Sequence, residues 1–420
     1  MKRKFISTVF IAVTCMASMA FAGADNDVLA SCDCPPNRCD CPPPPKKECC
    51  PCPPKCVKSP SKCSCCDYMT CCPLLPLPVK CGNVFVEGEY LYWKAYTEVP
   101  YAIARRTVPP YTAGTQLVVD EDVKSVNMNA SSGYRLGMGA YLSDCSLLYG
   151  TYRQFATDGT DGISASATTS MPLSEQQWLI FVWNSNIPTS IFSTPGPPNT
   201  ANARQRHREK VLDFDFLREF ACGRFSINPF VGVRFAWVKS DLSIDYFRGR
   251  DPNSSIPIDG YLNHTDVNNH MNFGVGLHTG LQSNVDLGWG FGLFGTSSVS
   301  ALVGQFQFEH REDVTDLVFV APFPPIPYTT TRSFKVTDFQ TAWELGVGLD
   351  WGHHFCDCAY YLGFKVGYEA NIWPNFFRSF HTLRPNGSVL DGVIQGGDRM
   401  SLWSRSLLTH GLNVGARFDF

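Results

Sequence analysis

The stretch LNVGARFDF, residues 412–420, alternates strictly between two kinds of side chain. Leu412, Val414, Ala416, Phe418 and Phe420 fall on one face, and Asn, Gly, Arg and Asp residues fall on the other. A period of two predicts a β-strand, because successive side chains of a strand point to opposite faces. An aromatic-ended strand of this kind is typical of a closing strand in a membrane barrel, apolar toward lipid and polar toward the lumen.

Comparable segments recur along the chain and are joined by connections that alternate between short and long. Ten predicted strands cover residues 84–93, 134–142, 145–155, 211–221, 226–244, 270–282, 287–309, 334–350, 358–373 and 402–420. Short periplasmic turns and longer extracellular loops are the rule for outer-membrane barrels. The sequence therefore predicts an all-β, antiparallel, up-and-down transmembrane barrel over residues 83–420. Ten strands are expected, and up to sixteen if the loops at 96–131 and 157–207 add to the wall.

The alternation also assigns a face to individual side chains. In 84–93, the strand face that carries Val84 and Tyr90 is predicted to contact lipid. In 270–282, Met271 shares the lipid-facing parity with Phe273 and Val275, and a short turn at 283–286 is expected to follow.

The composition and the first residues fit export to a membrane. Aromatic residues make up 13% of the chain and charged residues 17%, yet the mean hydropathy is only −0.10. Residues 1–22 combine a basic start, an apolar core and the site Ala20-Phe21-Ala22, which predicts a signal peptide. No other run is long and apolar enough for a spanning helix, so the mature chain is expected to cross as a closed barrel. The net charge of −3 gives no indication of nucleic-acid binding.

Residues 23–82 form a separate segment rich in cysteine and proline. Fourteen of the nineteen cysteines and thirteen prolines lie between residues 32 and 81. This proline density excludes helix and central strand. Metal binding is disfavoured, because the spacings are mostly C-x-C and CC rather than C-x₂-C. A compact disulfide knot and an intermolecular cross-linking tail both remain open. We favour the tail, because a Pro-rich tether exposes its thiols to partners.

Cysteines of the barrel fall at predicted short turns, on the side where the cysteine-rich segment is expected to emerge. This placement predicts a periplasmic disulfide layer, since disulfides persist in oxidising compartments. The disulfide candidates are Cys32, Cys34, Cys39, Cys41, Cys49, Cys50, Cys52, Cys56, Cys63, Cys65, Cys66, Cys71, Cys72, Cys81, Cys145, Cys222, Cys356 and Cys358.

Three phrases of the sequence resemble a known family. GEYLYWKA, VLDFDFLREF with INPFVGVRFAWVKSDLSIDY, and GLNVGARFDF resemble the Legionella-type major outer membrane protein family and the MOMP-like porins of environmental chlamydiae. The resemblance covers roughly residues 83–420. It implies an outer-membrane barrel, pore formation and, in the chlamydial case, a disulfide-linked envelope. The segment 32–81 departs from the family's barrel pattern and strengthens the cross-linking role.

Charged side chains of the polar faces are the candidate lumen residues. They are Glu87, Glu89, Arg135, Asp213, Asp215, Arg234, His278, Glu344, Lys365, Glu369, Arg405 and Arg417. Both signs occur, which argues against strong ion selectivity. Structural salt bridges are the competing interpretation for each. Ten strands leave little open lumen, because eight-stranded barrels are filled by side chains and wide channels need about 16 strands.

Two further features lie in or beside the loop 157–207. The patch WLIFVW, bounded by Trp178 and Trp183, fits an extra strand, a loop folded into the lumen or an exposed contact site. Basic residues then follow at every second position, on the same strand face as the lipid-facing residues after them. They are candidates for binding lipopolysaccharide phosphates. They are Arg204, Arg206, Arg208 and Lys210. A solvated loop is the competing interpretation.

The function expected from these features is an outer-membrane porin-like channel for passive diffusion of small hydrophilic solutes, linked into the envelope by disulfides. The alternative is a cross-linked structural protein or adhesin with a closed lumen. No G-x-S-x-G, H-E-x-x-H or P-loop occurs, so no enzyme, metal or cofactor is expected. Expected partners are outer-membrane lipid and lipopolysaccharide, cysteine-rich envelope proteins, a second copy of the chain, and barrel assembly machinery through the Phe420 strand.

Overall fold

The computed structural model describes residues 84–107, 119–143, 146–164, 177–181, 200–248, 261–316, 327–355, 360–383 and 399–420. The predicted signal peptide and cysteine-rich segment lie outside these residues, as do Cys145, Cys356 and Cys358. Helices long and apolar enough to cross a membrane are absent from the described ranges.

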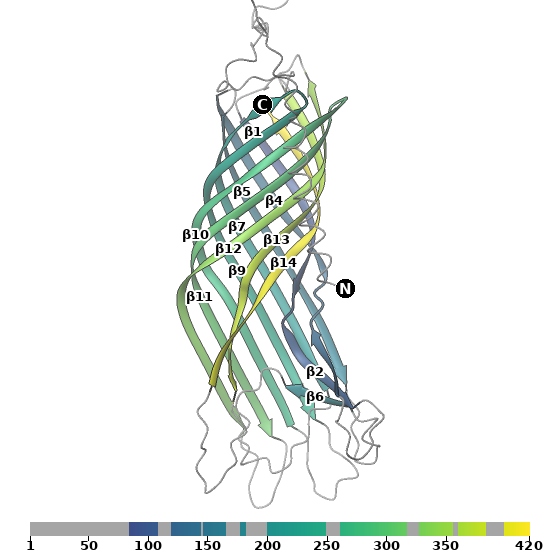
Figure 1. The fold of residues 1–420 in the computed structure, drawn as a ribbon, viewed down its shortest axis with the longest axis vertical. Helices are drawn as coiled ribbons and strands as arrows, with labels where there is room; N and C mark the ends of the chain where they lie inside the picture. Colours follow the sequence, from purple (N-terminus) through teal and green to yellow (C-terminus); the bar gives the residue numbers. More distant parts are fainter. Residues whose placement is uncertain are drawn as a thin grey trace, which may run out of the picture. The chain divides into compact units, whose positions relative to one another are not determined.

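Within the described residues, ten antiparallel strands close into a barrel, which confirms the predicted fold class and strand number (Figure 1). The barrel strands are β1 (Val84–Thr97), β4 (Ala130–Ser143), β5 (Ser146–Ser164), β7 (Thr200–Arg218), β9 (Phe225–Arg248), β10 (Tyr261–Gly288), β11 (Phe291–Asp316), β12 (Tyr328–Phe355), β13 (Tyr360–Leu383) and β14 (Arg399–Asp419). Each pairs with the barrel strands before and after it in sequence, and β14 closes the ring on β1. The short β8 (Phe220–Cys222) extends the edge of β9.

The closing strand has the two faces that the alternation predicts. Leu412 and Val414 are 52% and 53% exposed, whereas Asn413 and Asp419 are 1% and 5% exposed. Apolar side chains of this strand therefore point outward and polar ones point into the barrel, as expected for a wall in contact with lipid.

The barrel has two different ends, which we call the short-turn end and the long-loop end. Val84 and Phe420 meet at the short-turn end, where the Val84 carbonyl accepts a hydrogen bond of 3.0 Å from the Phe420 amide. The strand connections at 143–146, 288–291 and 355–360 lie at this end as well. β9 to β13 contain 24 to 28 residues each. Because about 9–11 residues span a bilayer, these strands continue well beyond the lipid.

The turn between β10 and β11 lies later than the sequence predicted. Residues 283–286 are still paired in the ladder, as Ser283 with Gly295 shows. The turn forms instead at Trp289 and Gly290, with φ angles of 58° and 81°. Two flanking glycines, Gly288 and Gly290, supply the left-handed backbone that a tight turn needs. The polar run SNVD resembled a turn but is part of the strand.

The face predicted for Met271 is wrong. Its side chain is fully buried inside the barrel, whereas Phe273 faces outward and is 42% exposed. The ladder shifts register between Met271 and Phe273, which marks a β-bulge. The bulge adds one residue, so the alternation changes sides there.

Both ends of the loop predicted at 157–207 are strand, over the described residues 157–164 and 200–207. β5 continues to Ser164 and β7 begins at Thr200, and these two ends pair with each other. Polar residues occupy both faces here, so the hydrophobic alternation that marks a strand is missing from the sequence.

A second, three-stranded sheet forms from the remaining described parts of the predicted loops. It consists of β2 (Pro100–Thr107), β3 (Val119–Ser125) and β6 (Gln177–Phe181), in the order β3-β2-β6. Tyr101 and Leu179 are fully buried in one apolar cluster with the inward-facing Ala203 and Tyr246 of the wall. The sheet therefore packs inside the long-loop end rather than widening the barrel. Of the three interpretations of the 178–183 patch, a strand folded against the lumen fits the described residues.

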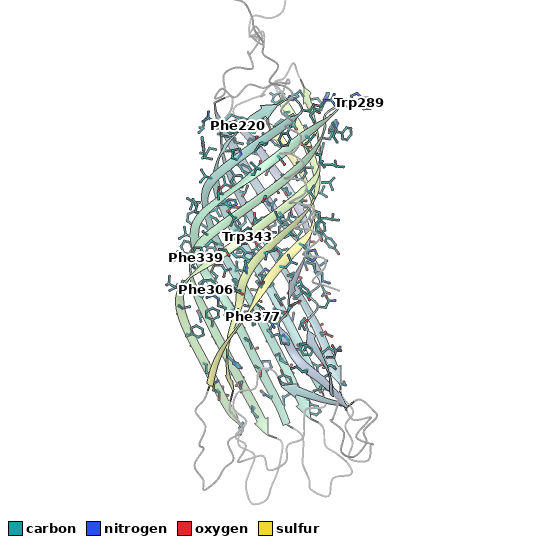
Figure 2. All side chains as sticks on the ribbon, viewed as in Figure 1. Phe220, Trp289, Phe306, Phe339, Trp343 and Phe377 are labelled. Carbon is teal, nitrogen blue, oxygen red and sulfur yellow. The ribbon has the colours of Figure 1, made fainter. Side chains whose placement is uncertain are left out.

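The long-loop part of β13 and β14, residues 374–383 and 399–406, forms a hairpin that we call the flap. Pairing of β12 with β13 ends at Trp343 and Ile372, while β13 and β14 stay paired as far as Leu383 and Arg399. A register shift follows Trp373. Phe377 is fully buried and, with Phe306, marks this region in Figure 2. The flap thus folds across the lumen instead of continuing the wall.

Candidate functional site in the barrel lumen

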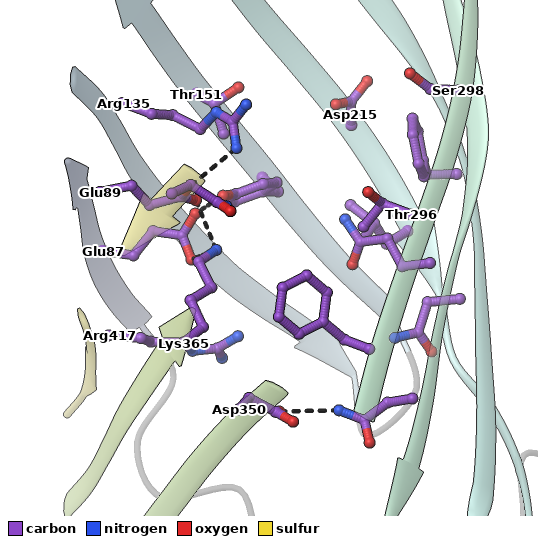
Figure 3. A pocket seen from close by; sticks show the side chains of 18 of the residues that line it. Glu87, Glu89, Arg135, Thr151, Asp215, Thr296, Ser298, Asp350, Lys365 and Arg417 are labelled. Atoms are coloured by element: carbon purple, nitrogen blue, oxygen red, sulfur yellow. Dashed lines mark hydrogen bonds and ion pairs between the residues drawn. The ribbon is translucent and has the colours of Figure 1, made fainter. Parts of the chain in front are cut away.

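A polar cavity of about 320 Å³ occupies the short-turn half of the lumen (Figure 3). Ten of the predicted lumen residues line it: Glu87, Glu89, Arg135, Asp213, Asp215, His278, Glu344, Lys365, Glu369 and Arg417. Arg234 lies behind this lining and is fully buried. Arg405 is separate from the others, because it lies on the flap opposite Phe377.

The first charge cluster lies between β1, β4, β13 and β14. The Arg135 guanidinium donates to both carboxylate oxygens of Glu369, at 2.9 and 2.7 Å, and to Glu89 at 3.0 Å. The Lys365 ammonium is 2.6 Å from Glu89 and 3.4 Å from Glu87. Asn413 donates to both Glu89 and Glu369. These bonds join strands that are far apart in sequence and hold their side chains across the cavity.

Glycines on the inward faces make room for these long side chains. A Cβ atom on Gly137 would lie 2.7 Å from Cγ of Glu87 and 2.8 Å from the Tyr149 hydroxyl. A Cβ atom on Gly415 would lie 2.7 Å from Cγ of Glu89. Such contacts are too close for any side chain, so these two glycines permit the close approach of charged groups to the backbone.

The second charge cluster is centred on Glu344 of β12. Two guanidinium groups bind its carboxylate: Arg234 at 2.8 and 3.0 Å, and Arg153 at 2.8 Å. Arg234 also donates to both carboxylate oxygens of Asp213, at 2.7 and 2.8 Å. Arg153 reaches Glu209 at 2.6 Å. Because charges in a low-dielectric interior are costly unless paired, the cluster ties four strands, β5, β7, β9 and β12, into one layer.

His278 links this layer to the cavity. Its Nδ1 atom is 2.9 Å from Asp215, and its Nε2 atom is 3.1 Å from Nη2 of Arg234. The imidazole is therefore held between the carboxylate of Asp215 and the guanidinium group of Arg234.

Arg153 and Glu209 are site residues that the sequence reasoning did not identify. Arg153 lies within the run TYRQF of β5, where polar residues occupy both faces. Glu209 lies in the part of β7 that was predicted to begin only at residue 211. The usable signal for Glu209 was its parity, which matches the inward-facing Asp213 and Asp215, two and three strand periods further on.

An apolar layer closes the cavity on the long-loop side. Trp93 forms the boundary, since the guanidinium carbons of Arg153 and Arg135 lie 5.4 and 6.0 Å from its ring centre. Beyond it, inward side chains of the wall and of Met128 form one buried cluster. It contains Leu91, Trp93, Ala95, Met128, Phe155, Val211, Ala236, Val238, Met271, Leu302, Phe306, Phe308, Ala342, Trp373, Phe376 and Leu407.

These apolar residues come from β1, β5, β7, β9, β10, β11, β12, β13 and β14. Because nearly the whole ring of strands contributes, the cluster fills the cross-section of the lumen. The flap and the small sheet pack beyond it. The cavity is thus polar at the short-turn end and blocked toward the long loops. Among the described residues, no group of His, Cys, Asp and Glu side chains is arranged to hold a metal ion.

The barrel wall and its charged lumen define a protein of the outer-membrane β-barrel class. The sequence also matches the family model of the Legionella pneumophila major outer membrane protein precursor over residues 77–418. The chain therefore belongs to that family, as the resemblance predicted, and its location is the outer membrane. No curated protein matches it by sequence.

Solved barrels share the fold only distantly. The outer membrane protease OmpT from Escherichia coli is 11% identical, with a TM-score of 0.36, and the match covers 80% of this chain and 97% of that one. The CymD monoaromatic hydrocarbon channel is 7% identical over 82% and 90%, with a TM-score of 0.28. A Pseudomonas aeruginosa FadL homologue is 7% identical over 81% and 90%, with a TM-score of 0.26. Likeness at this level carries no activity over to this chain.

The prediction that the chain is not an enzyme is corrected by the first of these structures. It rested on the absence of motifs known from soluble enzymes. OmpT is an outer membrane protease, so a barrel can be catalytic and missing soluble-enzyme motifs do not exclude catalysis. At 11% identity, the match assigns no protease activity to this chain either.

Proposed function

We propose that this protein is an outer-membrane channel for passive diffusion of small hydrophilic solutes, and that the structure represents its closed state. The observation that carries the proposal is the polar cavity, lined by charged groups from all sides of the barrel. A purely structural barrel has no need of a hydrated chamber. Filling it with apolar side chains would avoid the desolvation of so many charges.

Opening requires movement of the apolar layer, and the flap is the part of the wall best placed to move. Across the seam with β12, polar contacts take the place of the backbone ladder, which ends at Trp343 and Ile372. Arg378 binds Asp338, and the amide of Gln340 donates to the Pro374 carbonyl at 2.7 Å. The Arg378 backbone amide also donates to Asn269 at 2.9 Å. Since the described residues have no backbone ladder across this seam, the flap can move without unzipping the wall. Its movement would draw Phe376 and Phe377 out of the apolar clusters and so open the packed layer.

The cavity predicts weak charge selectivity. Acids and bases alternate around it, and each base described above is bonded to an acid. A conduction path with balanced charge favours neither cations nor anions strongly. The solutes that fit are therefore small, hydrophilic and of either charge.

The cysteine-rich segment and the barrel cysteines would link this channel into the envelope through disulfides on the periplasmic side. Support comes from Cys222, whose backbone ends β8 at the short-turn end of the barrel. Val84, where the described chain begins, lies at the same end. The short-turn end is the periplasmic side in outer-membrane barrels. The N-terminal segment would then lie in the periplasm, where disulfides persist.

A closed structural protein is the second candidate, and the packed apolar layer favours it. Liposome swelling separates the two functions. Vesicles that contain the full mature chain should swell in isotonic solutions of small sugars and amino acids, at a rate that falls with solute size. Empty vesicles and vesicles with heat-denatured protein are the controls. Swelling no faster than these controls, from protein that still shows heat-modifiable migration, would reject the channel and leave the structural role.

A further inference from the structure

A row of basic side chains runs along the outer face of β7 toward the long-loop end. Arg204, Arg206, Arg208 and Lys210 alternate with buried residues and are all exposed. They lie in a regular strand, paired on both sides with β5 and β9. A solvated loop, the competing interpretation of this charge run, is therefore excluded, and the four charges stand in a fixed line on the outer wall. Successive members are about 6.6 Å apart, two residues along a strand.

The row begins at the edge of the lipid-facing belt that is nearer the long-loop end. Phe214, four residues after Lys210 and nearer the short-turn end, is 51% exposed on the same face. Lys210 pairs in register with Trp237 of β9, whose ring lies 5.8 Å from that of Phe273. Aromatic belts of this kind mark the boundary between acyl chains and headgroups. The basic row thus starts where lipid phosphates lie.

Lys239 of β9 completes the cluster. It is exposed on the same outer face and lies directly opposite Arg208 in the ladder. Like charges in directly opposed positions, with Cβ atoms about 4.5–5.5 Å apart, destabilise a sheet unless an anion neutralises them. With Lys210, the pair brings three positive charges against the one nearby carboxylate of Asp241, which also binds His270, and this excess points to a bound anion in the native membrane.

The neighbouring acids are shared with other cations, and Asp241 lies close enough to Arg208 and Lys239 for its charge to attract both. Asp158, opposite Arg206, forms a 3.0 Å ion pair with Arg204. Asp241, on the other side of Arg206, lies 2.5 Å from His270. No ion pair within the described residues involves Arg208, Lys210 or Lys239.

We propose that Arg208, Lys210 and Lys239 form a binding site for the phosphate groups of lipopolysaccharide in the outer leaflet. A guanidinium group binds two phosphate oxygens at once, and the two ammonium groups add point charges. A hollow of about 740 Å³ adjoins the site on the long-loop side, and its lining includes Arg204, Arg206 and His264 together with Asp161, Asp241 and Asp245, so it suits neutral sugar hydroxyls rather than further phosphates. It lies on the headgroup side of the phosphates and takes their polar sugars.

The test uses the full mature chain in detergent micelles, titrated with fluorescent lipopolysaccharide at low and high salt. The variant replaces Arg208, Lys210 and Lys239 by Gln. Its Kd should rise at least tenfold at low salt, an order-of-magnitude figure for loss of three charge-assisted contacts. The control variant replaces three other cations, Lys94, Arg224 and Lys335, by Gln and makes the same change in net charge. Its Kd should stay within about twofold of the wild type, since distant charges are screened.

Four ligands distinguish the sources of phosphate. Lipopolysaccharide should bind best to the wild type, and lipopolysaccharide stripped of phosphate should bind the wild type and the triple variant equally weakly. Inorganic phosphate and phosphatidylglycerol should compete poorly. Equal affinity of wild type and triple variant for intact lipopolysaccharide would overturn the site. It would also be overturned if the wild type bound the stripped form as tightly as intact lipopolysaccharide. If the wild type bound phosphatidylglycerol as tightly as lipopolysaccharide, the specific site for lipopolysaccharide would be rejected in favour of a site for anionic lipids in general. The ligand comparison on the wild type stands even if the variant misfolds.

Discussion

The two halves of this lumen belong to one barrel but are filled in opposite ways. In the short-turn half, inward side chains are charged and surround a cavity, as Glu89 and Arg135 do. In the long-loop half, inward side chains are apolar and packed, as Phe306 and Phe308 are at a ring distance of 5.9 Å. The outer wall shows the reverse order, because Phe214 faces outward near the short turns and Arg206 near the long loops.

This reversal follows from the surroundings of each half. Where lipid covers the outside, apolar groups face outward and polar groups are placed inside. Beyond the lipid, water covers the outside, and the strands behave like those of a soluble protein with an apolar core. One barrel therefore contains a membrane domain with a hydrated chamber and, stacked on it, a water-exposed domain with a packed interior. Conduction depends on whether the packed half can open.

The largest predicted effect concerns the packed half. Replacing Trp93 by Ala removes the ring that separates the charge clusters from the apolar layer, and should lower the free energy of unfolding by about 3–5 kcal/mol through the cavity left behind. The same variant should lengthen channel openings. Urea unfolding in lipid vesicles measures the first effect and planar-bilayer recording the second. The control is Trp289→Ala at a turn, where the side chain is 97% exposed and no loss is expected. Equal losses for the two variants would contradict the packed layer.

A smaller effect is expected in the charged half. Replacing Glu344 by Gln leaves the size of the side chain unchanged but removes the negative charge shared by Arg153 and Arg234. Loss of charge-assisted hydrogen bonds should lower the free energy of unfolding by about 2 kcal/mol. The cavity also gains net positive charge, so reversal potentials in a salt gradient should shift toward anion preference. Unchanged reversal potential in a conducting variant would mean that Glu344 is not on the solute path. Glu98→Gln, at an exposed position outside the cavity, is the matched control.

The smallest predicted effect concerns the seam between β12 and the flap. Asp338→Asn removes the acid that binds Arg378, at a position where the carboxylate is 41% exposed. Exposed ion pairs contribute little, about 0.5 kcal/mol, and this corresponds to roughly a twofold rise in the open fraction of the channel. The open fraction in single-channel records gives this number directly. A variant with unaltered open fraction would show that the flap is not the moving part.

The sequence predicted the barrel well where lipid enforces alternation. Leu412, Val414 and Phe418 have the predicted face, and all ten strands occur where apolar alternation placed them. Beyond the lipid, the sequence predicted neither the full length of the strands nor the face of every side chain. Residues 200–210 are strand, but they carry polar groups on both faces and so show no hydrophobic period. Met271 was assigned to the wrong face, because a bulge is not visible in a pattern of apolar residues.

The candidate site was predictable only in part, for a related reason. Charged residues between apolar ones, such as Glu89 and Glu369, were assigned to the lumen by parity alone. The packed half was not foreseen, because alternation shows that a strand has two faces but not which face meets water. In β11, the lipid-facing Val303 and the buried Phe306 have opposite parity, so the apolar side changes along a single strand. Only the three-dimensional positions of the strands show where that change occurs.

Single-channel recording of the full mature chain in a planar bilayer, beside Trp93→Ala, tests the central claim most directly. A lumen with a hydrated half and a packed half should give brief, well-separated openings in the wild type and clearly longer openings in the variant. Continuous ohmic conductance from the wild type would contradict the packed layer. Electrical silence from both proteins, each shown to be folded by heat-modifiable migration, would contradict the channel and leave a closed barrel with a structural role in the envelope.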